Sequence, residues 1–180
     1  MSTNLLPKEY QWLINEPGPK LVLEFLKIYG IKEKPGNLNN PEILKWAEEC
    51  GIPNYTHDSI AWCGLTIALL VKRTERPVVE NPLWARNWLN FGVEVPIKEA
   101  KFGDILVFKR PGGGGHVGLY IAEDSTAFHC GGGNTGDMVK IARIAKSRCI
   151  GVRRPVYNVM PSNVREIIVK SNGKLSTNEG

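Results

Sequence analysis

The sequence lacks paired cysteines at metal-binding spacing, long apolar runs and repeated segments. Its four cysteines stand at positions 50, 63, 130 and 149 of 180 residues, and no spacing makes a CxxC pair or a zinc-finger pattern. No internal repeat or low-complexity segment is visible either. These absences exclude a structural zinc module and a repeat array, and a chain of 20.0 kDa is expected to form one domain.

The N-terminus lacks the features of a secretory signal. The first residues, MSTNLLPKEYQWL, contain no basic segment followed by a long apolar one. No apolar run elsewhere approaches the roughly 20 residues that cross a bilayer. The sequence therefore predicts synthesis in the cytoplasm without a signal peptide, reduced thiols and no integral membrane association.

The composition is ordinary except for its charge. Hydrophobic residues make up 42% and charged residues 23%, but the formal net charge is +5 and the isoelectric point is near 9.0. This charge suits nucleic acid, an anionic membrane surface or an acidic envelope polymer. No aromatic residues interleave with the densest basic cluster, so no nucleic acid partner is expected. That cluster comprises Arg143, Lys146, Arg148, Arg153 and Arg154.

Helix signals dominate the first half of the chain. Asn40 suits an N-cap, Pro41 the first helical position and Gly51 a helix stop. The segment 59–73 is too long and too continuously apolar for a strand, which predicts a buried helix. Four helices are expected, over 20–29, 41–50, 59–73 and 82–90.

Strand signals follow beyond Pro96, as short apolar runs separated by glycine and acidic turns. Helices first and strands second is the order of an α+β domain, so we expect N-terminal helices packed on a C-terminal antiparallel sheet. The expected strands cover 104–109, 117–122, 126–130, 138–144 and 149–153.

The last residues are less apolar than the rest. We assign 1–155 to the domain and 156–180 to a C-terminal tail. Ser171-Asn172-Gly173 is a tight-turn signal between 166–170 and 175–177. The turn favours a small appended hairpin over a loose end.

Cys63 is the candidate nucleophile, because it falls in the first turn of the expected helix over 59–73. A helix N-terminus lowers the pKa of a thiol through its unpaired N–H groups and the positive end of its dipole. The same amides suit the oxyanion that forms when a peptide carbonyl is attacked. A small buried core thiol is the alternative interpretation of this cysteine.

His116 is the candidate base, since it follows the glycine run 112–115 and opens an expected strand. Imidazole is the usual base for a thiol, and a third group must orient it. Two residues are candidates for that third group: Asn134, after a second glycine run, and His129, on the neighbouring strand. A turn residue and a half-buried strand residue are the respective alternatives.

Four further residues are candidates for substrate contact. Asp58 lies just upstream of Cys63, where capping of the helix or the preceding turn is the favoured role. Trp62, Trp84 and Trp88 are candidate groove-lining residues, although tryptophan is more often part of a core.

The order of the motifs resembles a known superfamily. D-S-I-A-W-C-G, F-G-D-I-L-V-F, G-G-H-V-G-L-Y, G-G-N and R-R-P follow one another as in the NlpC-type papain-like peptidases, close to the CHAP amidases. The upstream stretch GIKEKPGNLNNPEILKWAEECG is similar to a phage-associated, endolysin-like subfamily. The resemblance runs from Leu21 to Pro155.

This resemblance implies a papain-like fold in which Cys63 and His116 form the catalytic pair. Typical NlpC-type enzymes place a second histidine one strand later, similar to His129, whereas the phage-like subfamily carries a G-G-N motif that ends here at Asn134. We favour Asn134. The sequence departs from the commoner G-G-N-Q at Thr135, so no role of a glutamine is carried over.

The implied reaction is attack of the Cys63 thiolate on an amide of bacterial cell-wall peptide, with peptidoglycan as substrate and a monomeric enzyme that needs no metal and no organic cofactor. No clustered acidic loop suggests the calcium bound by some CHAP relatives. The enzyme is expected to act on the wall after release or export. Acyl transfer by the same pair, and a non-catalytic wall-binding or virion module, are the alternatives.

Overall fold

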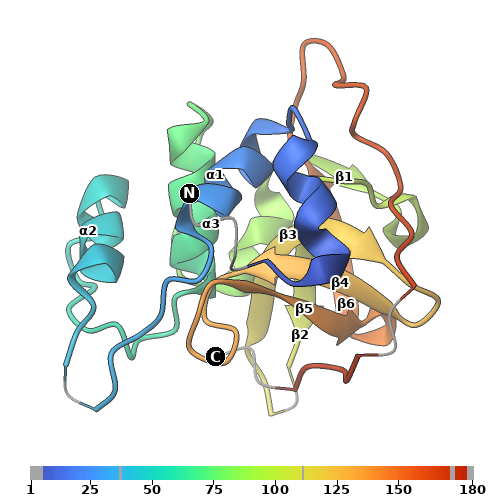
Figure 1. The fold of residues 1–180 in the computed structure, drawn as a ribbon. Helices are drawn as coiled ribbons and strands as arrows, with labels where there is room; N and C mark the ends of the chain where they lie inside the picture. Colours follow the sequence, from blue (N-terminus) through green and yellow to red (C-terminus); the bar gives the residue numbers. More distant parts are fainter. Residues whose placement is uncertain (1–5, 37, 111, 171–172, 178–180) are drawn as a thin grey trace.

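The computed structural model describes residues 6–36, 38–110, 112–170 and 173–177. Within these residues, six strands form one antiparallel sheet in the order β1-β6-β2-β3-β4-β5 (Figure 1). The strands are β1 (Val93–Val95), β2 (Ile105–Lys109), β3 (Gly115–Glu123), β4 (Ala127–Gly132), β5 (Lys140–Ala145) and β6 (Cys149–Arg154).

The helices precede most of the sheet in the chain, so the α+β prediction is confirmed. The α-helices are α1 (Lys20–Ile28), α2 (Pro41–Cys50) and α3 (Cys63–Arg73). Short 3-10 helices are η2 (Lys8–Asn15), η3 (Ala85–Asn90), η4 (Ile97–Glu99) and η5 (Lys146–Arg148). No helix in the described part of the chain is long and apolar enough to span a bilayer.

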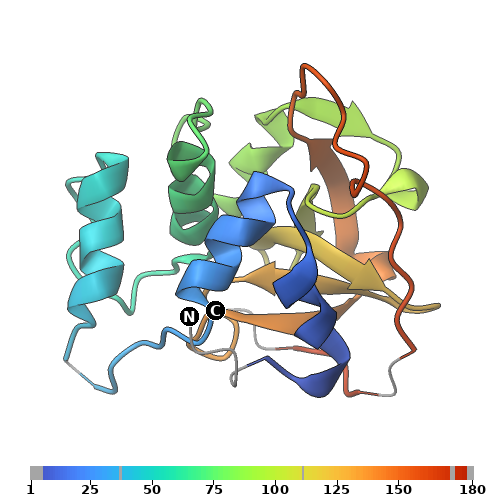
Figure 2. The ribbon, with the colours of Figure 1, turned by 45° about the horizontal axis from the view of Figure 1, so that its top comes forward.

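The central helix is α3, which contacts α1 and α2 and packs against β3 (Figure 2). Every residue from Cys63 to Val71 is buried, as the continuous apolar character of this segment predicts. The helix starts at Cys63, after Trp62 in a non-helical conformation. The candidate nucleophile is thus the first residue of a helix enclosed by other elements.

The ends of α2 follow the predicted capping chemistry. The Asn40 side chain accepts the backbone N–H of Glu42 at 2.9 Å, and Gly51 adopts the left-handed conformation at the C-cap. These local bonds satisfy helix-end groups that water or a distant residue would otherwise have to satisfy.

The helix expected over 82–90 is shorter than predicted, because only Ala85–Asn90 is helical and it is a 3-10 helix. The Pro82 carbonyl accepts the indole N–H of Trp88 at 2.9 Å rather than a helical N–H. Pro82 also lies against α3, since a Cβ built on Gly64 would be 2.1 Å from its oxygen. Contact with α3 therefore prevents a regular helical start.

The tail runs in extended form along the molecule (Figures 1 and 2). Ile168 pairs with Glu123 in a parallel bridge, and the Phe102 N–H donates to the Arg165 carbonyl at 2.9 Å. The segment expected as the first arm of a hairpin thus contacts the end of β3. Of the predicted turn at 171–173, residues 171 and 172 lie outside the described residues.

Candidate active site

The Cys63 thiol lies where the N-terminus of α3 meets β3. The residue is 3% exposed. Burial raises the pKa of the thiol, while the backbone N–H groups of Val117 and Gly64 and the Arg110 cation act in the opposite direction. The net shift is upward, so the resting group is a neutral thiol that needs a base to ionise it.

His116 immediately precedes Val117 on β3 and is fully buried. It is the register partner of Phe108 on the neighbouring strand β2, and the two ring centroids lie 6.3 Å apart. On the other side, Nε2 faces β4, because a Cβ built on Gly132 would lie 3.7 Å from it. The peptide between His116 and Val117 carries the N–H that approaches the Cys63 sulfur, so the structure brings the two predicted catalytic residues into one neighbourhood.

Asn134 lies beside the start of α3. It is 4% exposed and has a positive φ of 53°, as expected for an asparagine in a glycine-rich turn. With its amide oriented to match its neighbours, Oδ1 accepts the Trp62 backbone N–H at 3.2 Å and Nδ2 donates to the Glu33 carboxylate at 3.2 Å. Asn134 therefore bonds the backbone of the residue next to the candidate nucleophile.

His129 belongs to a separate buried network. Its Nδ1 bonds the Tyr10 hydroxyl at 2.8 Å and its Nε2 bonds Asp124 at 2.9 Å. Asp124 also accepts hydrogen bonds from Arg143 and Thr126. Both ring nitrogens of His129 thus have partners other than His116.

Three of the four expected substrate contacts need correction. Trp62 and Trp88 are fully buried and belong to the core, so neither presents a surface to a ligand. Asp58 is also buried, and its carboxylate accepts the backbone N–H groups of Lys34 and Asn40 at 3.1 and 2.7 Å. It therefore fixes the segment before α2, and not the helix of Cys63 or the turn before that helix, as capping had predicted.

Trp84 differs from the other two tryptophans, since it is 70% exposed. The residues after it lie along the glycine run that leads to His116, and Arg86 Nε donates to the Gly114 carbonyl at 2.9 Å. A Cβ on Gly115 would lie 3.3 Å from the Arg86 side chain. Trp84 is thus an exposed aromatic residue two positions before Arg86, which contacts the glycine run next to His116.

Glu33 is the residue of this site that the sequence did not reveal. Its carboxylate accepts the indole N–H of Trp62 as well as the Asn134 amide. Glu33 lies near the start of the stretch GIKEKPGNLNNPEILKWAEECG, but no local signal marks it as a site residue, and its partner Trp62 is 29 positions away. Only the folded chain brings them together.

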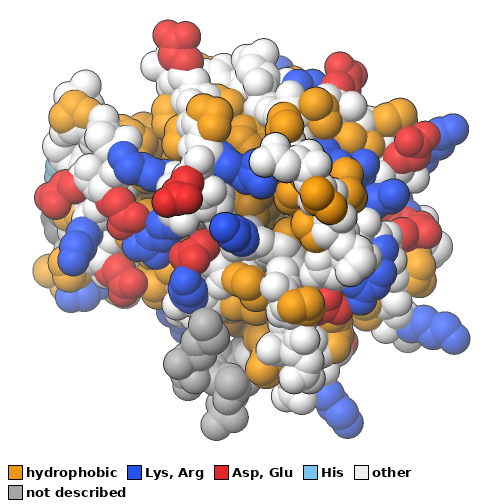
Figure 3. All heavy atoms as spheres, turned by 90° about the horizontal axis from the view of Figure 1, so that it is seen from above, with side chains coloured by type: hydrophobic (Ala, Val, Ile, Leu, Met, Phe, Trp, Pro, Cys, Tyr) orange, Lys and Arg blue, Asp and Glu red, His pale blue; other side chains and the backbone are white. Residues whose placement is uncertain are grey.

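The basic cluster predicted from the sequence is largely paired. Carboxylates meet four of its members, in the pairs Arg143–Asp124, Lys146–Glu123, Arg153–Glu94 and Arg154–Asp104, and Arg148 donates to the Lys109 carbonyl. On the face shown in Figure 3, cationic and anionic side chains are interspersed with apolar ones. The described residues contain no group of three metal-ligating side chains of the His, Cys, Asp and Glu types.

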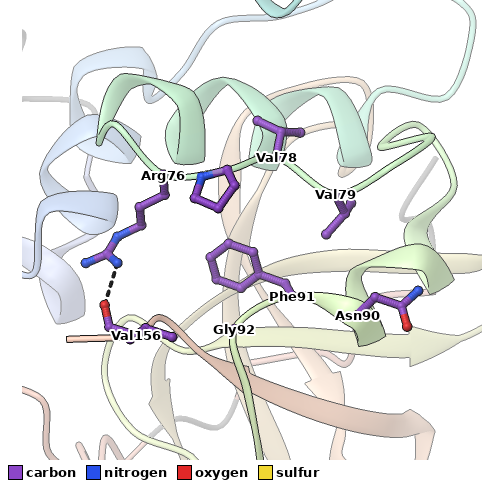
Figure 4. Close-up of a pocket in the computed structure, with 8 residues that line it drawn as sticks. Arg76, Val78, Val79, Asn90, Phe91, Gly92 and Val156 are labelled. Carbon is purple, nitrogen blue, oxygen red and sulfur yellow. Dashed lines mark hydrogen bonds between the residues drawn. The ribbon is translucent and has the colours of Figure 1, made fainter.

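A separate groove lies near the opposite end of α3 (Figure 4). Arg76 closes one side by donating to the Val156 carbonyl at 2.5 Å. A helix of 11 residues is about 16 Å long, which separates this groove from Cys63. The lining is mostly apolar and includes Pro77, Val78, Val79, Asn90, Phe91 and Gly92.

Comparisons with known proteins leave the site to be interpreted from its own geometry. No family model matches the chain, and a search of the curated proteins finds no match. What the structure provides is a cysteine at a helix N-terminus, a histidine on the adjacent strand, and an asparagine that bonds the backbone of Trp62, the residue before the cysteine.

Proposed function

We propose that this protein is a papain-like cysteine hydrolase of bacterial cell-wall peptide, similar to phage endolysins, with Cys63 as nucleophile and His116 as base. One observation carries the proposal. Helix α3 packs against β3 and the backbone N–H of Val117 lowers the pKa of the Cys63 thiol, so the helix N-terminus that holds the cysteine lies near the strand position that follows the histidine. A thiol beside an imidazole at a helix N-terminus is the arrangement that nucleophilic acyl chemistry requires.

The proposed reaction has two halves. His116 takes the thiol proton, the Cys63 sulfur bonds to the amide carbonyl carbon, and the first amides of α3 stabilise the oxyanion. The C–N bond then breaks, and the imidazolium gives its proton to the leaving amine. In the second half, water loses a proton to His116, attacks the thioester and releases the carboxylic acid as the proton returns to the thiol.

Asn134 remains the proposed third residue of the site, but it acts on the cysteine side, because its amide bonds Trp62 and Glu33 rather than His116. It bonds the backbone of Trp62 beside the nucleophile, whereas the ring nitrogens of His129 bond Tyr10 and Asp124. Because these partners occupy both ring nitrogens, His129 is assigned to the scaffold and not to the catalytic site.

The test is release of soluble fragments from purified peptidoglycan, with the new termini identified by mass spectrometry. We expect wild-type protein to release fragments, Cys63→Ala to release none, and His116→Ala to be slower by about 10²- to 10⁴-fold. Cys50→Ala is the matched control, because this half-buried thiol lies at the end of α2. The termini name the bond, and an added amine that appears in the product would indicate acyl transfer. No release by wild-type protein from several wall types would support a non-catalytic module instead.

A further inference from the structure

Glu33 and Asn134 together hold both N–H groups of Trp62, the residue that leads into the nucleophile. The Glu33 carboxylate accepts the indole Nε1–H, and Asn134 Oδ1 accepts the backbone N–H at 3.2 Å. The Asn134 amide also donates to Glu33 Oε1 at 3.2 Å, so the three residues form a closed set of hydrogen bonds. We call Glu33 and Asn134 the Trp62 clamp.

The other polar group of Trp62 is fixed by α3 itself. The backbone N–H and the hydroxyl of Thr66 both donate to the Trp62 carbonyl, each at 2.9 Å. Trp62 is the N-cap of α3 but provides no side-chain cap, and its indole is fully buried against Trp46. The clamp therefore determines where the first turn of α3 begins, and with it where Cys63 lies.

We propose that Glu33 is a positioning residue, which acts through Trp62 and Asn134 to hold the Cys63 sulfur in register with His116. The inference rests on the proposed function, since it assigns Glu33 a role in that same site. Hydrogen bonds to an ionised carboxylate are about twice as strong as neutral ones. A displacement of about 1 Å at a reacting atom lowers a rate by about 10²-fold, so a modest loosening of the clamp has a large effect.

The surroundings of Glu33 make the clamp sensitive to pH. Burial raises the pKa of the Glu33 carboxyl, the Trp62 hydrogen bond lowers it, and the charges of Asp137 and Asp58 raise it further. One side of Glu33 lines an open surface hollow, so protons can reach it. The hollow is also lined by Lys32, Lys34, Ser59, Gly136 and Met138. The carboxyl takes up a proton at higher pH than an ordinary glutamate and then holds the two N–H groups less strongly.

The first test is kinetic, with a soluble peptidoglycan fragment as substrate. We expect Glu33→Ala to lower kcat/KM by about 10- to 100-fold, mainly through kcat. Glu33→Gln keeps a neutral acceptor, so we expect a smaller loss and an acid limb of the pH profile displaced to lower pH. Glu48→Ala, at an exposed position on α2, is the control and should match wild-type protein. Wild-type kinetics and an unchanged acid limb in both Glu33 variants would overturn the proposal.

The second test does not depend on turnover. The rate of alkylation by iodoacetamide is measured at each cysteine by peptide mapping. Loosening the first turn of α3 should expose the thiol. In Glu33→Ala and Glu33→Gln, the alkylation rate at Cys63 should therefore rise several-fold over wild-type protein. The rates at the buried Cys130 and Cys149 should stay the same. Equal rates at Cys63 overturn the clamp. If wild-type protein shows no turnover, the proposed function fails, and with it the effect of Glu33 on catalysis. The alkylation rate at Cys63 then decides by itself whether the clamp holds Cys63 in place. A rise at all cysteines together indicates general unfolding of Glu33→Ala, and the Glu33→Gln result then decides.

Discussion

At the scale of single residues, the site depends on close approach of backbone to side chain. A Cβ on Gly133 would lie 1.9 Å from Thr66 Oγ1 and 2.5 Å from the Trp62 ring. These distances leave no room for any side chain, because the ring is buried and the hydroxyl is bonded to the Trp62 carbonyl. The glycine before Asn134 is therefore required by packing at the N-terminus of α3.

We predict that Gly133→Ala lowers the free energy of unfolding by about 1 to 3 kcal/mol, because the new methyl group overpacks the Trp62 ring. Urea denaturation measures the change. Gly132→Ala is the comparison, since its Cβ would meet its nearest neighbour, the Val117 carbonyl oxygen, at 3.3 Å and should cost less. Equal stabilities of the two variants would contradict this account.

Sequence signals single out Cys63 and His116 as candidates, but not the residues that surround them. Cys63 stands at the start of an apolar run and His116 after a glycine run, so both carry local signals. The role of Glu33 depends on a contact across 29 positions, and the burial of Trp88 depends on the packing of a whole layer. Local pattern cannot carry that information, which is why Trp62 and Trp88 were wrongly expected at a groove.

At the scale of elements, hydrogen bonds to His129 connect three parts of the fold. His129 of β4 bonds the Tyr10 hydroxyl of η2 through one ring nitrogen and Asp124 of the β3–β4 turn through the other. Arg143 of β5 adds an ion pair to Asp124. Burial lowers the pKa of His129, and the Asp124 hydrogen bond and charge only partly offset this. The neutral imidazole is therefore the form that the folded protein favours.

This network predicts a pH-dependent stability. Above a pH of about 6.5, His129 is neutral in both states and its contribution is complete. As the pH falls below that value the unfolded chain binds a proton that the folded chain does not, so stability falls by at most about 1.4 kcal/mol per pH unit. Urea denaturation between about pH 5 and 7 should show this slope in wild-type protein and lose it in His129→Gln.

The matched control for that slope is His57→Gln, at an exposed position, which should keep the wild-type dependence. Below about pH 4 the carboxylate of Asp124 adds a second loss. Burial opposes the ionisation of Asp124, but hydrogen bonds from Arg143, Thr126 and His129 together lower its pKa. An identical slope in wild-type protein and His129→Gln would disprove the role of His129.

Elements with local signals were the ones that the sequence predicted well. The helix over 41–50 has its cap, its first-turn proline and its terminal glycine within the segment, and its bounds agree with α2. β1 was missed, since its three residues are too few to show alternation and it exists through pairing with β6. η2 was missed for a similar reason, because its buried Tyr10 and Leu13 gain their environment from distant parts of the chain.

At the scale of the whole molecule, the C-terminal tail joins the beginning of the chain to the sheet. Arg165 pairs with Glu16 at 2.7 Å, and Asn163 donates to the Gly18 carbonyl. Further along, the Glu123 N–H donates to the Ile167 carbonyl and the Val169 N–H donates to the Glu123 carbonyl at the end of β3. The tail is thus held by partners from both halves of the fold, none of which its own sequence identifies.

A variant that ends at Pro155 is therefore predicted to have a lower thermal midpoint than the full chain. Removal of the tail leaves the Phe102 N–H without its Arg165 acceptor and uncovers apolar surface around the buried Val164. A variant that ends at Lys170 keeps these contacts and should lose much less. Differential scanning calorimetry compares the three proteins. Equal midpoints would assign the tail no part in stability.

The glycine run before His116 has a consequence for how this protein can change. A Cβ on Gly112, Gly113 or Gly114 meets nothing within 4 Å, whereas Gly133 has no such space. New side chains that accept a positive φ, asparagine and aspartate first, can enter this exposed loop without disturbing the core. Sequence variation, in nature or in a laboratory library, is therefore accommodated most easily in this loop, whereas the close packing of Gly133 against Trp62 and Thr66 leaves no room for a side chain.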